Sequence, residues 1–425
     1  MRQSIQASLG LVALAACTPA SDAGGRAGAE VRDSAGVQIV TSSVPAWSES
    51  ERWTLGTDPL FVLHGSDGTP ENRLLDPSSI DVDSRGRVIV ADGLMAGWHA
   101  VLVYDSLGRF QFQAGGRGNG PGEFGQLWWA STYRGDSIVA FDMSGDKLSV
   151  FDSEGKFARQ LRSPRVEGPI PARGTWGYTD GIDAAYGDGH FLAYPGGSLD
   201  ISAGAGPAWY THQLVRLAPD GERWDSLGTF EISQQYWDGQ KQEQLWFGPW
   251  TVRAVDDSSL YFGRGDRFEI SRHSPDGRVT RIIRWAATAR PMTQEYRDRN
   301  RDWYLDMVRS SPEVNDQILE RIANDLVTAR HAEYLPAYSG LLVDGAGYLW
   351  VEEFRWTSNT DPFPVMGPTR WWVFRPDGSW AGSVEAPPGL IIRKVTMDRV
   401  FGFMVDDDGV KEVLAYRLDR KGEGP

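Results

Sequence analysis

The chain has 425 residues and a formal net charge of −14, with 49 glycines, 24 prolines and 12% aromatic residues. This acidic balance disfavours binding to nucleic acid or to an anionic lipid surface through bulk electrostatics, so we expect no nucleic-acid partner. The single cysteine, Cys17, excludes a disulfide within the chain and a cysteine-based metal site. Abundant glycine and proline without a heptad or collagen-like period are typical of many short strands joined by tight turns.

The first residues have the pattern of a bacterial lipoprotein signal. A basic start precedes an apolar run of about ten residues from Ile5 to Leu14, which is too short to span a bilayer. The segment Leu14-Ala15-Ala16-Cys17 resembles the lipobox, in which the cysteine is lipidated and becomes the first residue of the mature protein. We therefore predict a signal peptide over 1–16, lipidation of Cys17 and a flexible tether over 17–35, with plain secretory cleavage as the alternative.

The residue after this cysteine indicates which membrane holds the protein. In the lipoproteins that the motif resembles, an aspartate at that position favours retention in the inner membrane, whereas this chain has Thr18. We therefore expect a lipid-anchored protein of the bacterial cell envelope, in the outer membrane and facing the periplasm or the cell surface.

One short hairpin recurs five times along the rest of the chain. Two copies occupy 103–110 and 150–157, and three more surround Asp220, Asp276 and Asp377. Each copy joins two strands of branched and aromatic residues through a turn rich in Asp and Gly, so we expect these aspartates to be structural. A second pair of strands precedes each hairpin and completes a four-stranded antiparallel unit of about 35 to 50 residues, which is the size of a propeller blade.

Six such units fit the sequence. They occupy 76–115, 127–162, 177–232, 249–287, 337–386 and 389–420. The last unit lacks an outer strand, and the strand-like segment 60–63 has no partner, so we predict that this segment completes the last blade and closes the ring. The predicted fold class is all-β, a six-bladed β-propeller over 36–425 closed by an N-terminal strand.

A family resemblance supports this interpretation. The glycine-rich linker 114–124 and the strands within 80–92 and 101–105 resemble those of NHL repeats. The chain as a whole resembles a six-bladed propeller lipoprotein of the NHL-like group, most sharply in the first blade. The resemblance implies the fold and leaves the activity open, because propellers host many unrelated functions.

One stretch between the fourth and fifth blades breaks the strand pattern. Apolar residues recur at helical spacing within 293–309 and again every four positions from Val314 to Leu326, after Ser311 and Pro312. This spacing predicts a helical hairpin inserted over 293–332. The hairpin either packs against the propeller or forms a lid over one end of its channel.

Aromatic residues gather just before the predicted inner strands, whose starts share one end of the channel in a propeller. Such rings stack on sugar faces and apolar ligands, and the structural alternative is that they fill the wedges between blades. The candidate ligand-binding residues are Trp128, Trp129, Tyr178, Asp180, Trp250, Arg253, Tyr338 and Glu352.

Other catalytic patterns have little support, and the catalytic residues are unknown. The six histidines show none of the paired spacings of a metal site, so we expect no cofactor. In the alternative of a Ca²⁺ site on the channel axis, the ligands would come from carboxylates such as Asp183 and Glu352. The chain has no Gly-x-Ser-x-Gly elbow, and no Ser-His-Asp triad follows from spacing alone.

The preferred interpretation is a lipid-anchored, monomeric propeller that binds a peptide, a glycan or an envelope protein at its channel mouth, without catalysis. The first alternative is a metal-dependent hydrolase or lactonase of the propeller type. The second is a structural scaffold of the envelope, with the helical hairpin as its partner surface.

Overall fold

The computed structural model describes residues 28–65, 74–94, 98–162, 181–194, 196–309, 314–355, 369–406 and 409–421. The predicted signal peptide, Cys17, Tyr178 and Asp180 lie outside these residues. Among the described residues, no helix is long and apolar enough to cross a membrane.

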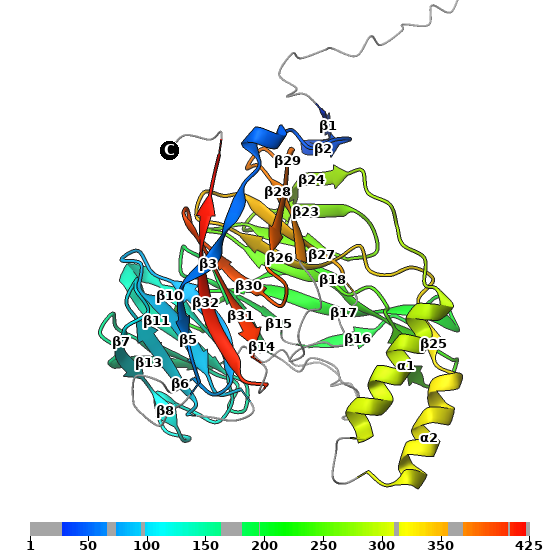
Figure 1. Cartoon of the computed structure of the whole chain (residues 1–425), viewed down its shortest axis with the longest axis horizontal. Helices are drawn as coiled ribbons and strands as arrows, with labels where there is room; N and C mark the ends of the chain where they lie inside the picture. The colour runs from blue at the N-terminus through cyan, green and yellow to red at the C-terminus, as the bar shows by residue number, and fades with distance from the viewer. Residues whose placement is uncertain are drawn as a thin grey trace, which may run out of the picture.

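Six sheets of the described chain form the blades, and the strands named below for each blade pair antiparallel (Figure 1). Two further sheets are short parallel pairs outside the blades. Blade 1 contains β4 (Pro77–Val82), β5 (Val88–Asp92), β6 (Ala100–Tyr104) and β7 (Phe110–Ala114), and blade 2 contains β10 (Leu127–Tyr133), β11 (Ser137–Asp142), β12 (Lys147–Phe151) and β13 (Phe157–Arg162). Blade 3 contains β14 (Gly181–Ala185), β15 (Phe191–Tyr194), β17 (Gly206–Leu217), β18 (Trp224–Trp237) and β19 (Gln242–Glu243), with β16 (Gly197–Leu199) paired to β17. Blade 4 contains β21 (Val252–Val255), β22 (Leu260–Gly263), β23 (Glu269–His273) and β24 (Val279–Trp285), and blade 5 contains β26 (Tyr338–Val343), β27 (Leu349–Glu353), β28 (Thr369–Phe374) and β29 (Trp380–Ala386). Blade 6 contains β30 (Ile391–Val395), β31 (Arg399–Val405), β32 (Lys411–Asp419) and β3 (Thr54–Leu63).

The first strand of each blade lies at the centre of the ring. β4 contacts both β10 and β30, and β26 contacts both β21 and β30. The indole Nε1 of Trp129 donates to the carbonyl of Ile182 at 2.8 Å and links β10 to β14, while Arg253 and Asp183 link β21 to β14. These contacts run through all six first strands and close the innermost ring of a propeller.

The ring is closed by the N-terminal strand, as the sequence predicts. β3 pairs antiparallel with β32, with Leu63 opposite Val413 and Thr54 opposite Asp419. The strand is longer than the predicted segment 60–63 because register shifts around Pro59 carry the pairing past the proline. The all-β, six-bladed fold closed by an N-terminal strand is therefore confirmed.

The repeated hairpin turns owe their shape to one carboxylate. In blade 1, Oδ1 of Asp105 accepts from the backbone N–H groups of Leu107 and Arg109, both at 2.9 Å. Gly108 supplies the positive φ of +80° that this turn requires. Asp152 makes the equivalent bonds in blade 2, so these aspartates shape the outer turns.

Part of the predicted tether 17–35 forms a strand. β1 (Ala29–Ser34) forms a hairpin with β2 (Val37–Ser42), and β2 continues the sheet of blade 4 by pairing parallel to β24. The chain then crosses blade 5, where the backbone N–H of Trp47 donates to the carbonyl of Ala381 at 2.7 Å, before it enters β3. We call residues 29–53 the N-terminal strap, since it covers the outer edges of two blades before it closes the ring.

The helical hairpin is present between blades 4 and 5. It consists of α1 (Gln294–Arg309) and α2 (Asp316–Val327), and both helices extend away from the sheets in Figure 1. α2 is capped by Asn315, whose side chain accepts from the N–H of Ile318 at 3.0 Å, while Ser311 and Pro312 lie outside the described residues. At its base, β20 (Leu245–Trp246) pairs parallel to β25 (Arg330–His331), and the ring of Trp246 packs on Tyr304.

Ring closure is reinforced by a buried cation at the end of β32. Arg420 donates to Oδ2 of Asp344 at 2.7 Å and to the carbonyl of Thr396 at 2.8 Å, and its guanidinium lies 4.3 Å from the centre of the Trp53 ring. The side chain of Asp344 is fully buried and also accepts from Nε1 of Trp350. Arg420 thus joins the end of blade 6 to blade 5 and to the N-terminal strap.

We predict that Arg420→Ala lowers the free energy of unfolding by about 3–5 kcal/mol, because it leaves the buried carboxylate of Asp344 without its cation. Urea unfolding measures the change. Arg417→Ala, an exposed position on the same strand, is the control and is expected to change stability by less than about 0.5 kcal/mol. Equal effects of the two substitutions would contradict the assigned role of Arg420.

Candidate functional site

The innermost strand has a β-bulge in blades 1, 2, 3, 5 and 6. The register of each strand shifts around a single residue, and the five shifted residues are Ser78, Trp128, Asp183, Ser339 and Arg393. A bulge leaves one residue out of the ladder and re-aims its side chain, and bulges are common next to functional sites. The structure therefore places five irregular positions around the centre of the ring, four of which carry polar side chains.

Opposite charges pair between neighbouring blades at this centre. Arg253 on β21 donates to Oδ2 of Asp183 on β14 at 2.7 Å, and Nζ of Lys394 on β30 lies 2.6 Å from Oδ1 of Asp81 on β4. Nζ of Lys411 donates to Asp76 at 3.3 Å. We call these pairs, together with Glu352 and Arg393, the central network.

Asp81 is the best-connected member of the central network. Its Oδ2 accepts from the hydroxyls of Ser131 and Thr132 at 2.5 and 2.8 Å, so the carboxylate links blades 6, 1 and 2. Burial alone would raise the pKa of Asp81, but the charge of Lys394 and these donors outweigh it and hold the pKa below its usual range. Asp81 is therefore ionised and neutralised in place.

Glu352 behaves in the opposite way. It accepts from the hydroxyl of Ser339 at 3.0 Å, and burial raises its pKa although the charge of Arg393 opposes the shift. The network contains four carboxylates and four cations, so its formal charge is balanced. The described residues contain no group of three or more His, Cys, Asp and Glu side chains placed to hold a metal ion.

Large apolar side chains are exposed around one end of the ring. Trp128 and Trp250, at the starts of the innermost strands of blades 2 and 4, are 37% and 42% exposed. The turn after the second strand of a blade lies at this end too. Gly93, which follows β5, donates its N–H to the carbonyl of Asp76 just before β4, and its carbonyl accepts from the N–H of Leu127 at the start of β10. We call this end of the ring the mouth and its exposed large apolar side chains the mouth rim. They are Leu75, Trp98, Trp128, Met143, Trp250 and Tyr334.

The structure separates the six described candidates for ligand binding into three groups of two. Trp128 and Trp250 lie exposed at the mouth, while Arg253 and Glu352 belong to the central network beneath it. The other two described candidates are buried between blades. Trp129 stacks on Phe141 at 6.2 Å, and the hydroxyl of Tyr338 donates to the carbonyl of Glu269 at 2.7 Å. Both fill wedges, which was the structural alternative for these rings.

Sequence reasoning identified Arg253 but missed the other three cations of the central network, Arg393, Lys394 and Lys411. Lys394 and Arg393 are adjacent on a strand, and Asp81 lies on another strand more than 300 residues earlier. Only ring closure brings them together. An aspartate inside the innermost strand Pro77–Val82 was the signal available in the sequence.

Two aspartates at the mouth are structural acceptors with opposite pKa shifts. Asp92 accepts from the N–H groups of Leu75 and Asp76 at 2.8 Å, and Asp142 makes the equivalent bonds to Gly125 and Gln126. Burial raises the pKa of Asp92 to about 6. In Asp142 the backbone donors outweigh burial and the pKa is lowered, with Ser144 as a further donor.

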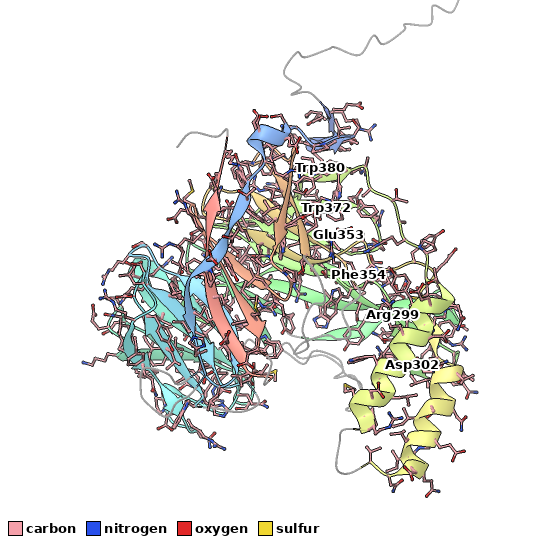
Figure 2. All side chains as sticks on the ribbon, viewed as in Figure 1. Arg299, Asp302, Glu353, Phe354, Trp372 and Trp380 are labelled. Atoms are coloured by element: carbon pink, nitrogen blue, oxygen red, sulfur yellow. The ribbon has the colours of Figure 1, made fainter. Side chains whose placement is uncertain are left out.

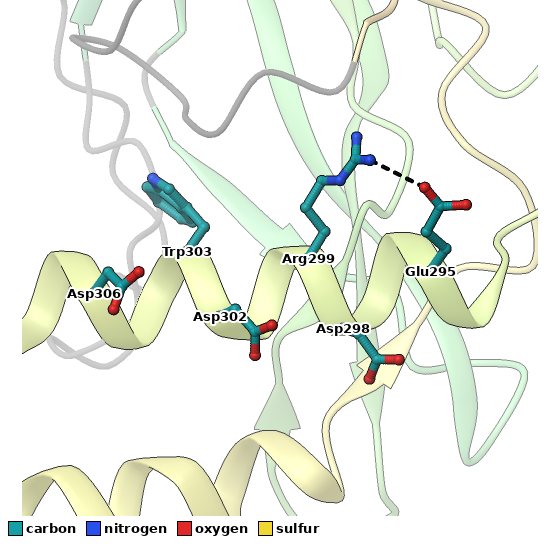
Figure 3. A pocket seen from close by; sticks show the side chains of 6 residues that line it. All are labelled: Glu295, Asp298, Arg299, Asp302, Trp303 and Asp306. Carbon is teal, nitrogen blue, oxygen red and sulfur yellow. Dashed lines mark hydrogen bonds and ion pairs between the residues drawn. The ribbon is translucent and has the colours of Figure 1, made fainter.

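The helical hairpin carries a surface hollow of a different kind. Figure 3 shows Glu295, Arg299 and Trp303 on one side of α1, with Asp298 and Asp302 on the other. Arg299 pairs with Glu295 at 3.0 Å, and Arg301 pairs with both Asp298 and Asp302. In Figure 2, Arg299 and Asp302 lie far from Trp372 and Trp380 of blade 5. The acidic residues of this hollow are neutralised locally, so they offer no strong field to a ligand.

Comparisons with known proteins agree with the fold. A family model described as a 6-bladed beta-propeller matches residues 68–167. No curated protein sequence matches. The most similar solved structures include a gluconolactonase from Xanthomonas campestris, with 11% identity, 87% of this chain and 99% of that chain covered and a TM-score of 0.41.

Two other solved structures are similar at a comparable level. A putative exported protein from Bacteroides fragilis has 12% identity, covers 90% of this chain and 99% of its own, and has a TM-score of 0.47. Regucalcin from Agrobacterium tumefaciens, a calcium-binding protein, has 11% identity, coverages of 88% and 97% and a TM-score of 0.39. Likeness at this level carries no argument about activity. The six sheets and the family model identify the chain as a six-bladed β-propeller.

The shifted pKa of Asp92 predicts a pH-dependent stability difference from Asp92→Asn. The native carboxyl binds its proton more tightly than the unfolded one, so its contribution to stability is present below pH 4 and is lost as pH rises to about 6. Across this range the stability of the wild type should fall relative to the variant by roughly 2–3 kcal/mol. Urea unfolding at pH 4, 5, 6 and 7 measures the difference, and a difference that does not change with pH would contradict the assignment.

Proposed function

We propose that this protein is a lipid-anchored ligand-binding module of the bacterial cell envelope, and that its ligand is a glycan held at the mouth rim. The observation that carries the proposal is the set of six exposed large apolar side chains at the end where the innermost strands begin. Single exposed apolar residues are normal on a protein surface, whereas a group at one end of a propeller channel is typical of a binding site.

The chemistry of the rim and of the channel beneath it favours a neutral, flat ligand. Aromatic rings stack on the apolar faces of sugars, and Trp128 and Trp250 each expose more than a third of their surface. The central network balances its own charges, so it offers no net field to a strongly anionic or cationic ligand. Its hydroxyls and charged groups remain suitable partners for the polar edges of a sugar.

The anchor part of the proposal depends on the lipobox. Cys17 precedes the first described residue, Gly28, by 11 positions. An extended chain of this length spans at most about 40 Å, which keeps blade 4 close to the membrane surface because β1 and β2 join that blade. The mouth rim would then act within a few nanometres of the lipid.

Binding is tested with single tryptophan substitutions on the purified protein. Trp128→Ala and Trp250→Ala are expected to weaken binding to a glycan array or to soluble cell-wall fragments by about ten-fold or more each, because one stacking ring is worth roughly 1–3 kcal/mol. Trp224→Ala is the matched control, since Trp224 is 40% exposed but begins the outer strand β18 at the other end of its blade. Unchanged binding in both rim variants, or an equal loss in the control, would remove the rim from the site.

Anchoring is tested separately by Cys17→Ser in the intact cell. The variant is expected to move from the membrane fraction to the soluble fraction, and metabolic labelling with a fatty acid should mark only the wild type. Sucrose-gradient fractions distinguish the outer membrane from the inner one. Membrane retention of the variant would contradict lipidation without affecting the proposal for the rim.

A further inference from the structure

Blade 4 departs from the repeat at one buried position, His273. The outer turns of four blades share one backbone hydrogen bond, in which the N–H of the first turn residue donates to the carbonyl of the residue four positions later. The pairs are Asp105 and Arg109, Asp152 and Lys156, Ser274 and Arg278, and Arg375 and Ser379. The residue before each turn is buried, and it is an aromatic ring in blades 1, 2 and 5. These residues are Tyr104, Phe151 and Phe374, with His273 in the same place in blade 4.

The hydrogen bonds of His273 fix the tautomer of its ring. Nδ1 lies 3.0 Å from the carbonyl oxygen of Gly277, which only accepts, so Nδ1 carries the proton. Nε2 lies 2.8 Å from Oγ of Ser271 and therefore presents its lone pair to that hydroxyl. The hydroxyl is also 3.1 Å from the carbonyl of Phe262, so Nε2 is the nearer of its two acceptors.

The ring is neutral at neutral pH. Burial lowers the pKa of His273, and the bond to Gly277 opposes this shift without cancelling it. A neutral imidazole with a protonated Nδ1 held by an acceptor and a free lone pair facing a hydroxyl is the arrangement of a general base beside a nucleophile. Here a backbone carbonyl takes the orienting place that a carboxylate often fills.

Ser271 and His273 line a cavity between blades 3 and 4. Its volume is about 190 Å³, and Phe230 and Phe262 form its apolar walls. Arg264 and Arg267 line the same cavity. Asp266 and Glu269 line it too. Arg264 pairs with Glu231 and Asp266, and Arg267 pairs with Asp266 at 3.3 Å and Glu269 at 3.9 Å, so both guanidinium groups are held in place.

We propose that Ser271 and His273 form a metal-independent nucleophile and base pair that hydrolyses small acyl esters. The cavity is small, so we choose acetyl esters as the first substrates to test. The two guanidinium groups supply donors for the negative oxygen of the tetrahedral intermediate. This activity lies outside the mouth rim and goes beyond the function proposed above.

The reaction proceeds in two balanced steps. Oγ of Ser271 attacks the ester carbonyl carbon while its proton passes to Nε2 of His273; the bond to the alcohol oxygen breaks, and Nε2 returns that proton to the leaving alcohol. Water then attacks the acyl-serine carbonyl and gives a proton to Nε2. The acyl–oxygen bond to Ser271 breaks, the serine regains its proton and the carboxylic acid is released.

The internal repeat supplies the variants for the test. Ser149 in blade 2 occupies the position of Ser271, with Phe151 in the position of His273, so Ser149 is a serine at the same place without a base. His273→Phe installs the ring type that three other blades carry at this position. Ser271→Ala removes one hydroxyl, and Ser149→Ala is its matched control.

The experiment uses the purified full chain with a fluorophosphonate probe and, in parallel, p-nitrophenyl acetate. We expect one probe per wild-type chain by intact mass, located at Ser271 by peptide mapping. Ser271→Ala should abolish labelling, His273→Phe should slow labelling and acetate release at least about 100-fold, and Ser149→Ala should match the wild type.

Failure of the wild type to label, or unchanged labelling in Ser271→Ala, would overturn the proposal and leave the pair as a hydrogen bond that satisfies a buried histidine. Thermal melting confirms that each variant is folded. If His273→Phe does not fold, Ser271→Ala decides the outcome alone, because removing one hydroxyl leaves the packing of the blade intact. Glycan binding at the mouth rim is unaffected by either result.

Discussion

The pairing of β3 with β32 joins the two ends of the chain, and the rest of the structure depends on it. Without it, blade 6 has three strands and the ring has two open edges, each a template for aggregation. Closure also sets the distance between the first strands of blades 1 and 6, which brings Asp81 to Lys394 and Asp76 to Lys411. A buried ion pair contributes little net stability, but it penalises any other arrangement of its partners. The charged centre therefore selects one relative placement of the blades more than it adds to the free energy of unfolding.

The repeat has a second consequence for function. Positions that are alike in several blades are occupied by turn-forming aspartates and by wedge-filling rings such as Tyr104 and Phe151. Positions that differ between blades include a tryptophan at one bulge, an aspartate at another, and a histidine in place of an aromatic ring. A propeller thus provides its own internal controls, because each unusual residue can be compared with its equivalents in the other blades.

Periodicity was enough to predict the fold, the closing strand and the helical insertion, because each depends on local alternation of apolar and polar residues. The register of strand pairing cannot be predicted from this alternation alone. The adjacent Trp128 and Trp129 look alike in the sequence, yet a bulge between Leu127 and Trp129 exposes one ring and buries the other. The end of the tether was misjudged because β1 is held by backbone pairing and is largely exposed, so it has no hydrophobic pattern. Two pairs of the central network, Asp81 with Lys394 and Asp76 with Lys411, join residues more than 300 positions apart and follow only from the closed ring.

The N-terminal strap also determines how the protein bears mechanical force. A pull on the N-terminus reaches β1 and β2 first, and these are bonded to the edge of blade 4 rather than to the closing strand. Parallel pairing of β2 with β24 and the bonds of Ala46 and Trp47 to blade 5 must break before tension reaches β3. The strap is thus the first described part of the chain to detach under a pull on the N-terminus, and the ring stays closed until β3 itself bears the load.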